Sequence, residues 1–156
     1  MTILYISLGA IAVALIVYIV MHIHQQKMSK EVQEKTEKSL KTYGEVTKEH
    51  HHTFLTIDDV TYQIVYVHVS SSAELTINST TIWEVREYGK SRLIHQGHLM
   101  TSKTPKIVVV YPLTQVIKRY INENEMEFVK YNKMFYNMYV VRHFELDSLL
   151  EELTHA

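Results

Sequence analysis

The sequence predicts an α/β domain (an α+β mixed sheet flanked by helices) preceded by one N-terminal transmembrane helix. Apolar and polar residues alternate in short runs between residues 54 and 87, as in half-buried strands. The segment 106–111 is continuously apolar after Lys106, as in a strand covered on both faces. An uncharged run at the N-terminus predicts the helix. We therefore expect a transmembrane anchor over residues 1–24, a charged helical stalk over 25–49 and the mixed α/β domain over 50–156.

The composition excludes several classes of protein. The 16 Lys and Arg residues nearly balance the 17 Asp and Glu residues, so no overall field attracts nucleic acid or anionic lipid. The absence of cysteine excludes a disulfide framework, a Cys-ligated zinc site, an iron–sulfur cluster and a thiol nucleophile. Roughly 100 residues remain for the domain, which is enough for one hydrophobic core.

The anchor is predicted from Thr2 to Met21, a run that contains no charged residue. A helix of this length, at about 1.5 Å per residue, spans roughly 30 Å, the thickness of a bilayer hydrocarbon core. A cleaved signal peptide is the alternative, but it needs a basic segment, and no basic residue precedes Ile3. We therefore expect residues 2–21 to remain in the lipid bilayer as a single pass.

Basic residues predict the orientation of the anchor. No Lys or Arg precedes the span, whereas five lysines follow it closely: Lys27, Lys30, Lys35, Lys38 and Lys41. The positive-inside rule then predicts a cell-membrane protein with its N-terminus outside and its C-terminal domain in the cytoplasm. Glu–Lys pairs four residues apart, such as Glu31–Lys35, favour a solvated helical stalk, and Gly44 is a candidate helix end.

The first half of the domain predicts strands. Residues 54–57 and 61–69 form a hairpin around two aspartates, and two further short strands are expected over 74–78 and 81–87, with Gly89 closing that block. We expect these strands to pair antiparallel.

The second half predicts strand–helix–strand–helix. The central strand over 106–111 is followed by a helix over 116–121 and a strand over 138–141. The C-terminal helix carries leucines from Leu146 to Leu153, with Ser148 and Glu151 in capping-box spacing. The elements together predict one mixed sheet with helices packed on it.

The candidate site lies in the short strands. Residues two apart on a strand point to the same face, so Glu84 and Arg86 should project together, and Glu74 on the preceding strand is placed to face them. Two carboxylates and a cation are the minimal equipment for holding Mg²⁺ or Mn²⁺ against a phosphodiester. Glu74 and Glu84 are therefore candidate metal ligands, and Glu74, Glu84 and Arg86 are candidate catalytic residues. The alternative is an exposed cross-strand Glu–Arg pair on an ordinary sheet.

This order of elements, over about Thr61 to Tyr111, resembles the core of the PD-(D/E)XK (restriction-endonuclease-like) nucleases. The resemblance implies a metal-dependent enzyme acting on nucleic acid, with Glu74 as the first acid, Glu84 as the second and Arg86 in the place of the lysine. The sequence departs from the family in having no Pro-Asp before the hairpin and in that arginine. A guanidinium is always charged and cannot take a proton from water, so the fold can match without cleavage.

Histidine clusters are a second candidate for chemistry. Ten histidines are present, including His22 with His24, the run His50–His52, and His95 with His98. Imidazoles at such spacing can bind Zn²⁺ or Ni²⁺, although a closed site needs separate clusters to meet in space. No phosphate-binding GxxxxGK loop and no G-x-S-x-G elbow is present.

The sequence therefore favours a single-pass membrane protein whose cytosolic α/β domain binds or scaffolds an unknown protein partner, without catalysis and without a cofactor. A metal-dependent nuclease-like enzyme using Mg²⁺ or Mn²⁺ and a histidine-based metal-responsive protein are the alternatives. Self-association as a homo-oligomer, through the anchor or the stalk, stays open.

Overall fold

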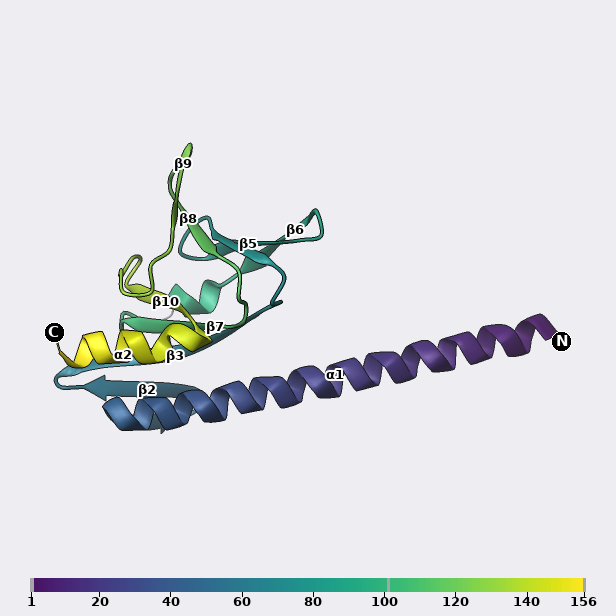
Figure 1. The fold of residues 1–156 in the computed structure, drawn as a ribbon, viewed down its shortest axis with the longest axis horizontal. Helices are drawn as coiled ribbons and strands as arrows, with labels where there is room; N and C mark the ends of the chain where they lie inside the picture. Colours follow the sequence, from purple (N-terminus) through teal and green to yellow (C-terminus); the bar gives the residue numbers. More distant parts are fainter. Residues whose placement is uncertain (1, 101, 156) are drawn as a thin grey trace. The chain divides into compact units, whose positions relative to one another are not determined.

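The structure is a computed structural model, which describes the backbone of residues 2–100 and 102–155 and their side chains except those of residues 2–10, 12 and 100. The chain divides into two compact units, residues 1–35 and residues 36–156. The first unit is helical, and the second contains two β-sheets (Figure 1).

The N-terminal helix α1 (Thr2–Tyr43) is continuous. Most of the first half of the predicted anchor, residues 2–10 and Ala12, has side chains outside the described residues. Among the described residues, no helix is both long and apolar enough to cross a membrane. The helix ends before Gly44, as the sequence predicts, and the Gly44 N–H donates to the Leu40 carbonyl oxygen at 3.1 Å.

Sheet A is the first of the two sheets, with the strand order β1-β2-β3-β7-β10. Its strands are β1 (Glu45–Glu49), β2 (His52–Ile57), β3 (Val60–Val69), β7 (Lys106–Pro112) and β10 (Met138–Arg142). The first three strands form an antiparallel meander, and β3, β7 and β10 run parallel. Residues 45–49 were expected in the helical stalk but form β1, because the helix ends at Tyr43 and the following residues pair with β2.

Sheet B has the strand order β6-β5-β4-β8-β9. Its strands are β4 (Glu74–Ile77), β5 (Ile82–Glu87), β6 (Lys90–His95), β8 (Ile117–Asn122) and β9 (Glu125–Phe128). The pair β4–β8 is parallel, and the other pairs of this sheet are antiparallel. The β5–β6 hairpin turns through Tyr88 and Gly89, whose φ angles of 48° and 73° are both positive, as a two-residue type I′ turn requires.

The same two chain segments pair in parallel in both sheets and so connect them. Strands β3 and β7 pair in sheet A, and the strands that follow each of them, β4 and β8, pair in sheet B from Leu75 and Ile117 onward. Between the two pairings, the Thr114 hydroxyl donates to the Ser71 carbonyl oxygen at 3.0 Å. The parallel strands of sheet A are thus connected through strands of sheet B rather than through helices, apart from the 3-10 turn η1 (Gly97–Met100).

The domain has three layers, namely the helices, sheet A and sheet B, and two hydrophobic cores lie between them. The larger core fills the space between the sheets and includes the fully buried Trp83. The smaller core lies on the other face of sheet A, where the end of α1 contributes Leu40 and the helix α2 (Leu146–Thr154) contributes Leu146, Leu149 and Leu150. Sheet A is therefore covered on both faces, whereas the described helices pack on sheet A and leave the outer face of sheet B without a helical layer.

The α/β class, the β2–β3 hairpin, the central strand β7, the strand β10 and the C-terminal helix agree with the sequence analysis. The prediction of a single mixed sheet is wrong, since there are two, and the strands β6 and β9 were not predicted. The helix expected over residues 116–121 is also wrong. Residues 117–122 form β8, because Ile117 pairs with β4 and a turn at Asn122–Asn124 leads into β9.

The cap expected at Ser148 is wrong as well. The helix α2 begins at Leu146, directly after the 3-10 turn η2 (His143–Glu145), and Ser148 lies inside it. The Arg142 N–H donates to the Glu145 carboxylate at 3.0 Å, and the two side chains also form an ion pair.

Candidate functional site

The predicted residues Glu74, Glu84 and Arg86 all lie on the outer face of sheet B. In the β4–β5 register, Glu74 is opposite Arg86 and Thr76 is opposite Glu84. Side chains alternate along each strand, and the intervening residues Leu75 and Val85 point into the core between the sheets. The two carboxylates are therefore diagonal neighbours across the β4–β5 pair.

Each carboxylate has its own cation. The Glu84 Oε1 atom lies 3.3 Å from the Arg86 Nη2 atom and accepts a hydrogen bond from the Ser91 hydroxyl at 2.5 Å. The Glu74 Oε2 atom lies 3.6 Å from the Lys118 Nζ atom. In the part of the chain that the structure describes, no three His, Asp or Glu side chains are grouped so that they could hold a metal ion. The acids are thus arranged as ion pairs.

A row of five side chains crosses the whole of sheet B. The register of neighbouring strands aligns, in order from β6 to β9, Leu93, Glu84, Thr76, Lys118 and Phe128. We call this set the transverse row. Its apolar ends, Leu93 and Phe128, are 55% and 64% exposed. Its middle carries a carboxylate, a hydroxyl and an ammonium group.

More apolar side chains flank the transverse row on the same face. Ile82 and Met126 are both exposed, Ile82 opposite His95 and Met126 opposite the half-buried Tyr120. The exposed apolar side chains thus form two groups, one toward β6 and one toward β9, with the charged middle of the transverse row between them. This face was not predicted from the sequence, because neither β6 nor β9 was expected and a helix was expected over residues 116–121. The signal for the β8–β9 hairpin was the Asn-Glu-Asn run at residues 122–124, followed by the alternating polar and apolar residues 125–128.

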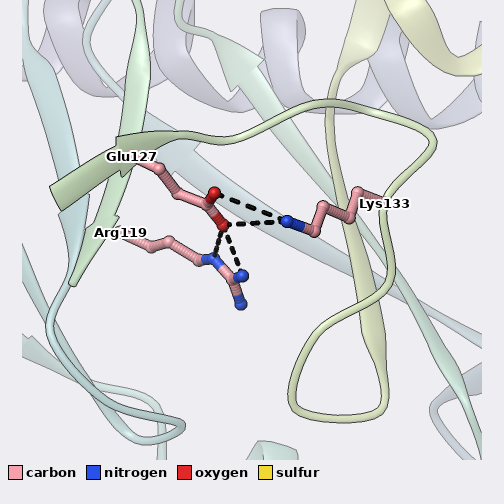
Figure 2. Close-up of polar contacts among 3 residues, drawn as sticks. All are labelled: Arg119, Glu127 and Lys133. Atoms are coloured by element: carbon pink, nitrogen blue, oxygen red, sulfur yellow. Dashed lines mark hydrogen bonds and ion pairs between the residues drawn. The ribbon is translucent and has the colours of Figure 1, made fainter. Parts of the chain in front are cut away.

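A separate polar cluster faces inward from β8 and β9. Figure 2 shows Arg119 and Lys133 both directed at the Glu127 carboxylate, at 2.6 Å from the arginine Nε atom and 3.3 Å from the lysine Nζ atom. The Arg119 guanidinium also lies 4.5 Å from the centroid of the buried Phe135 ring. The hydrogen bond from Arg119, followed by that from Lys133, lowers the pKa of Glu127. The cluster ties the β8–β9 hairpin to the segment that follows it.

A buried polar pair lies at the start of β7. The Lys106 ammonium donates to the carbonyl oxygens of Ser102 and Thr104 at 2.7 and 2.9 Å, and burial lowers the pKa of Lys106. Gln63 is its neighbour in β3, is similarly buried and has its Oε1 atom without a hydrogen-bond partner. The contacts of Lys106 fix the segment before β7, which is a structural role.

No protein-family model, curated protein or solved structure matches this chain. The PD-(D/E)XK resemblance therefore rests on the residues quoted for it alone.

Proposed function

We propose that this chain is a membrane-anchored binding module that pairs with a second copy of itself through the outer face of sheet B. The transverse row carries the proposal. It reads apolar, acidic, hydroxyl, basic and apolar across the five strands, so its two halves are alike in polarity and opposite in charge. Such a pattern is self-complementary, as a two-fold symmetric interface requires.

The charges select one orientation of the two copies. A two-fold axis that runs along the strands and passes over Thr76 brings Glu84 opposite Lys118 of the partner subunit. The same axis brings Leu93 opposite the partner's Phe128. An axis along the transverse row would instead oppose Glu84 to Glu84 of the partner subunit, and like charges disfavour that arrangement.

The same axis brings Glu74 opposite Glu74 of the partner subunit, because Glu74 lies on β4, the strand that carries Thr76. Arg86 lies opposite Glu74 in the register, and Lys118 is 3.6 Å from it, so each copy supplies two cations beside the pair. With Glu84, the face carries two acids and two bases and is neutral in each copy.

The anchor belongs to the same proposal. Thr2 to Met21 contains no charged residue, and the lysines that follow it favour a cytoplasmic position for the domain. Tethering to one membrane raises the effective concentration of the domains, so a modest interface is enough for pairing.

The experiment is a charge swap in the full chain. The chain has no cysteine, so His155→Cys gives one labelling site, and energy transfer between labelled copies in nanodiscs or neutral detergent reports pairing. Glu84→Lys should weaken pairing about tenfold or more. Adding Lys118→Glu should restore it, because both contacts across the axis become attractive again.

The matched control is Glu45→Lys, an exposed position on β1 of sheet A, which should leave pairing unchanged. Pairing that survives Glu84→Lys, or that the double substitution fails to restore, rejects this interface.

A metal-dependent nuclease is the second candidate, favoured by the register that places Glu74, Glu84 and Arg86 on one face. It predicts cleavage of single- or double-stranded DNA or RNA in Mg²⁺ or Mn²⁺, abolished by Glu84→Ala. Absence of cleavage, or cleavage that persists in the variant, removes this candidate and leaves the pairing proposal unaffected.

A further inference from the structure

The β5–β6 hairpin carries a cavity on the face opposite to the transverse row. Its volume is about 550 Å³, and it is lined by Val85, Glu87, Tyr88, Lys90, Ser91 and Arg92. In the register, Glu87 is opposite Lys90 and Val85 is opposite Arg92, so these four side chains share the inner face of the hairpin. Cavities of roughly 300–1,000 Å³ are of the size that holds small ligands.

Two cations, Lys90 and Arg92, and one carboxylate, Glu87, line the cavity. The Glu87 carboxylate accepts hydrogen bonds from the hydroxyls of Ser72 and Ser70, at 2.5 and 2.7 Å, and these bonds lower the pKa of Glu87. Within the described residues, neither Lys90 nor Arg92 has a carboxylate at ion-pair distance. Glu87 remains an anion in the cavity because its lowered pKa favours the charged form. Neither cation is ion-paired with it among the described residues, so both can contact an anionic ligand.

Tyr88 also lines the cavity. Its positive φ angle of 48° belongs to the type I′ turn of the hairpin, which leaves the residue 87% exposed. An aromatic ring exposed in this way beside two cations can cover the organic part of an anionic ligand.

We propose that this cavity binds a phosphate group. Arg92 offers a planar fork of donors that matches two phosphate oxygens, Lys90 adds a point charge, and Tyr88 covers the group attached to the phosphate. A phospholipid headgroup and a soluble phosphorylated molecule share this chemistry. The inference goes beyond the proposed pairing and does not depend on it, because the cavity and the transverse row lie on opposite faces of the hairpin.

The test is hydrogen–deuterium exchange of residues 82–95 in the full chain. In neutral detergent, inorganic phosphate should slow exchange in the hairpin relative to chloride at equal ionic strength. In nanodiscs, phosphatidylcholine alone is compared with phosphatidylcholine containing phosphatidylglycerol. Protection by inorganic phosphate indicates a soluble ligand, and protection only with phosphatidylglycerol indicates a headgroup.

The variants are Lys90→Gln and Arg92→Gln, each of which should raise the concentration needed for protection about tenfold or more. The matched control is Lys130→Gln, an exposed lysine outside the cavity, which should leave protection unchanged. The inference is overturned by a hairpin that neither phosphate nor phosphatidylglycerol protects, or by protection that is the same in Arg92→Gln.

Discussion

Gly44 lies so close to Thr56 that a Cβ atom built on the glycine would fall 2.3 Å from the Thr56 carbonyl oxygen. The contact occurs where α1 ends and the chain enters β1, whose first residue, Glu45, pairs with Thr56. Sheet A and the helix end can approach this closely only because the glycine has no side chain.

Gly44→Ala should therefore destabilise the protein, by about 1–3 kcal/mol, because the backbone has to shift to accept the methyl group. The free energy of unfolding of the full chain, from urea denaturation in neutral detergent, measures the effect. Gly97→Ala is the matched control, since a Cβ there meets nothing within 4 Å, and it should change stability by no more than about 1 kcal/mol. Equal effects at the two positions would contradict the close contact.

Leu40→Ala should cost about 2–5 kcal/mol of unfolding free energy, because Leu40 is fully buried in the core between the helices and sheet A. The same denaturation experiment measures it. Lys38→Ala, at an exposed position two residues earlier, should be nearly neutral. A neutral Leu40→Ala would mean that the end of α1 does not pack on the sheet.

Protonation of Glu127 should contribute to the loss of stability of the wild-type protein in acid. The pKa of this carboxyl is lowered from 4.5 in the folded state, so its ion pairs stabilise the fold above about pH 4.5 and lose that effect as the pH falls through the folded pKa. Glu127→Gln should lower stability near neutral pH and make the loss in acid shallower. Denaturation midpoints of both proteins at about pH 7 and about pH 3 provide the measurement. If the stability of the wild type and of Glu127→Gln fell equally between these pH values, the stabilising role of the Glu127 ion pairs would be contradicted.

Deprotonation of the Tyr66 hydroxyl should destabilise the protein at alkaline pH. Burial, and secondly the Glu37 carboxylate, raise the pKa of Tyr66 from 10.0 to about 12. The unfolded chain then loses this proton first, so the contribution to stability is full below pH 10 and is lost as the pH rises through the folded value. Tyr66→Phe should make the stability curve flatter over that interval. The control is Tyr88→Phe, an exposed position whose substitution should leave the curve as in the wild type.

The sequence alone predicts the elements whose pattern is complete within one segment. The alternating run of β2 buries one face, the runs of β3 and β7 are covered on both faces, and the leucines of α2 fall on one side of a helix. It also determined that Glu84 and Arg86 share a face, since side chains alternate along a strand whatever its neighbours are.

The division into two sheets and the residues on the outer face of sheet B depend on tertiary contacts. The apolar residues of segment 116–121 fit a helix face about as well as a strand, and the choice was made by parallel pairing of Ile117 with Leu75, which is distant in sequence. The same pairing aligned Lys118 with Thr76 and so completed the transverse row. Such pairings depend on which strands become neighbours, and local periodicity does not encode that information.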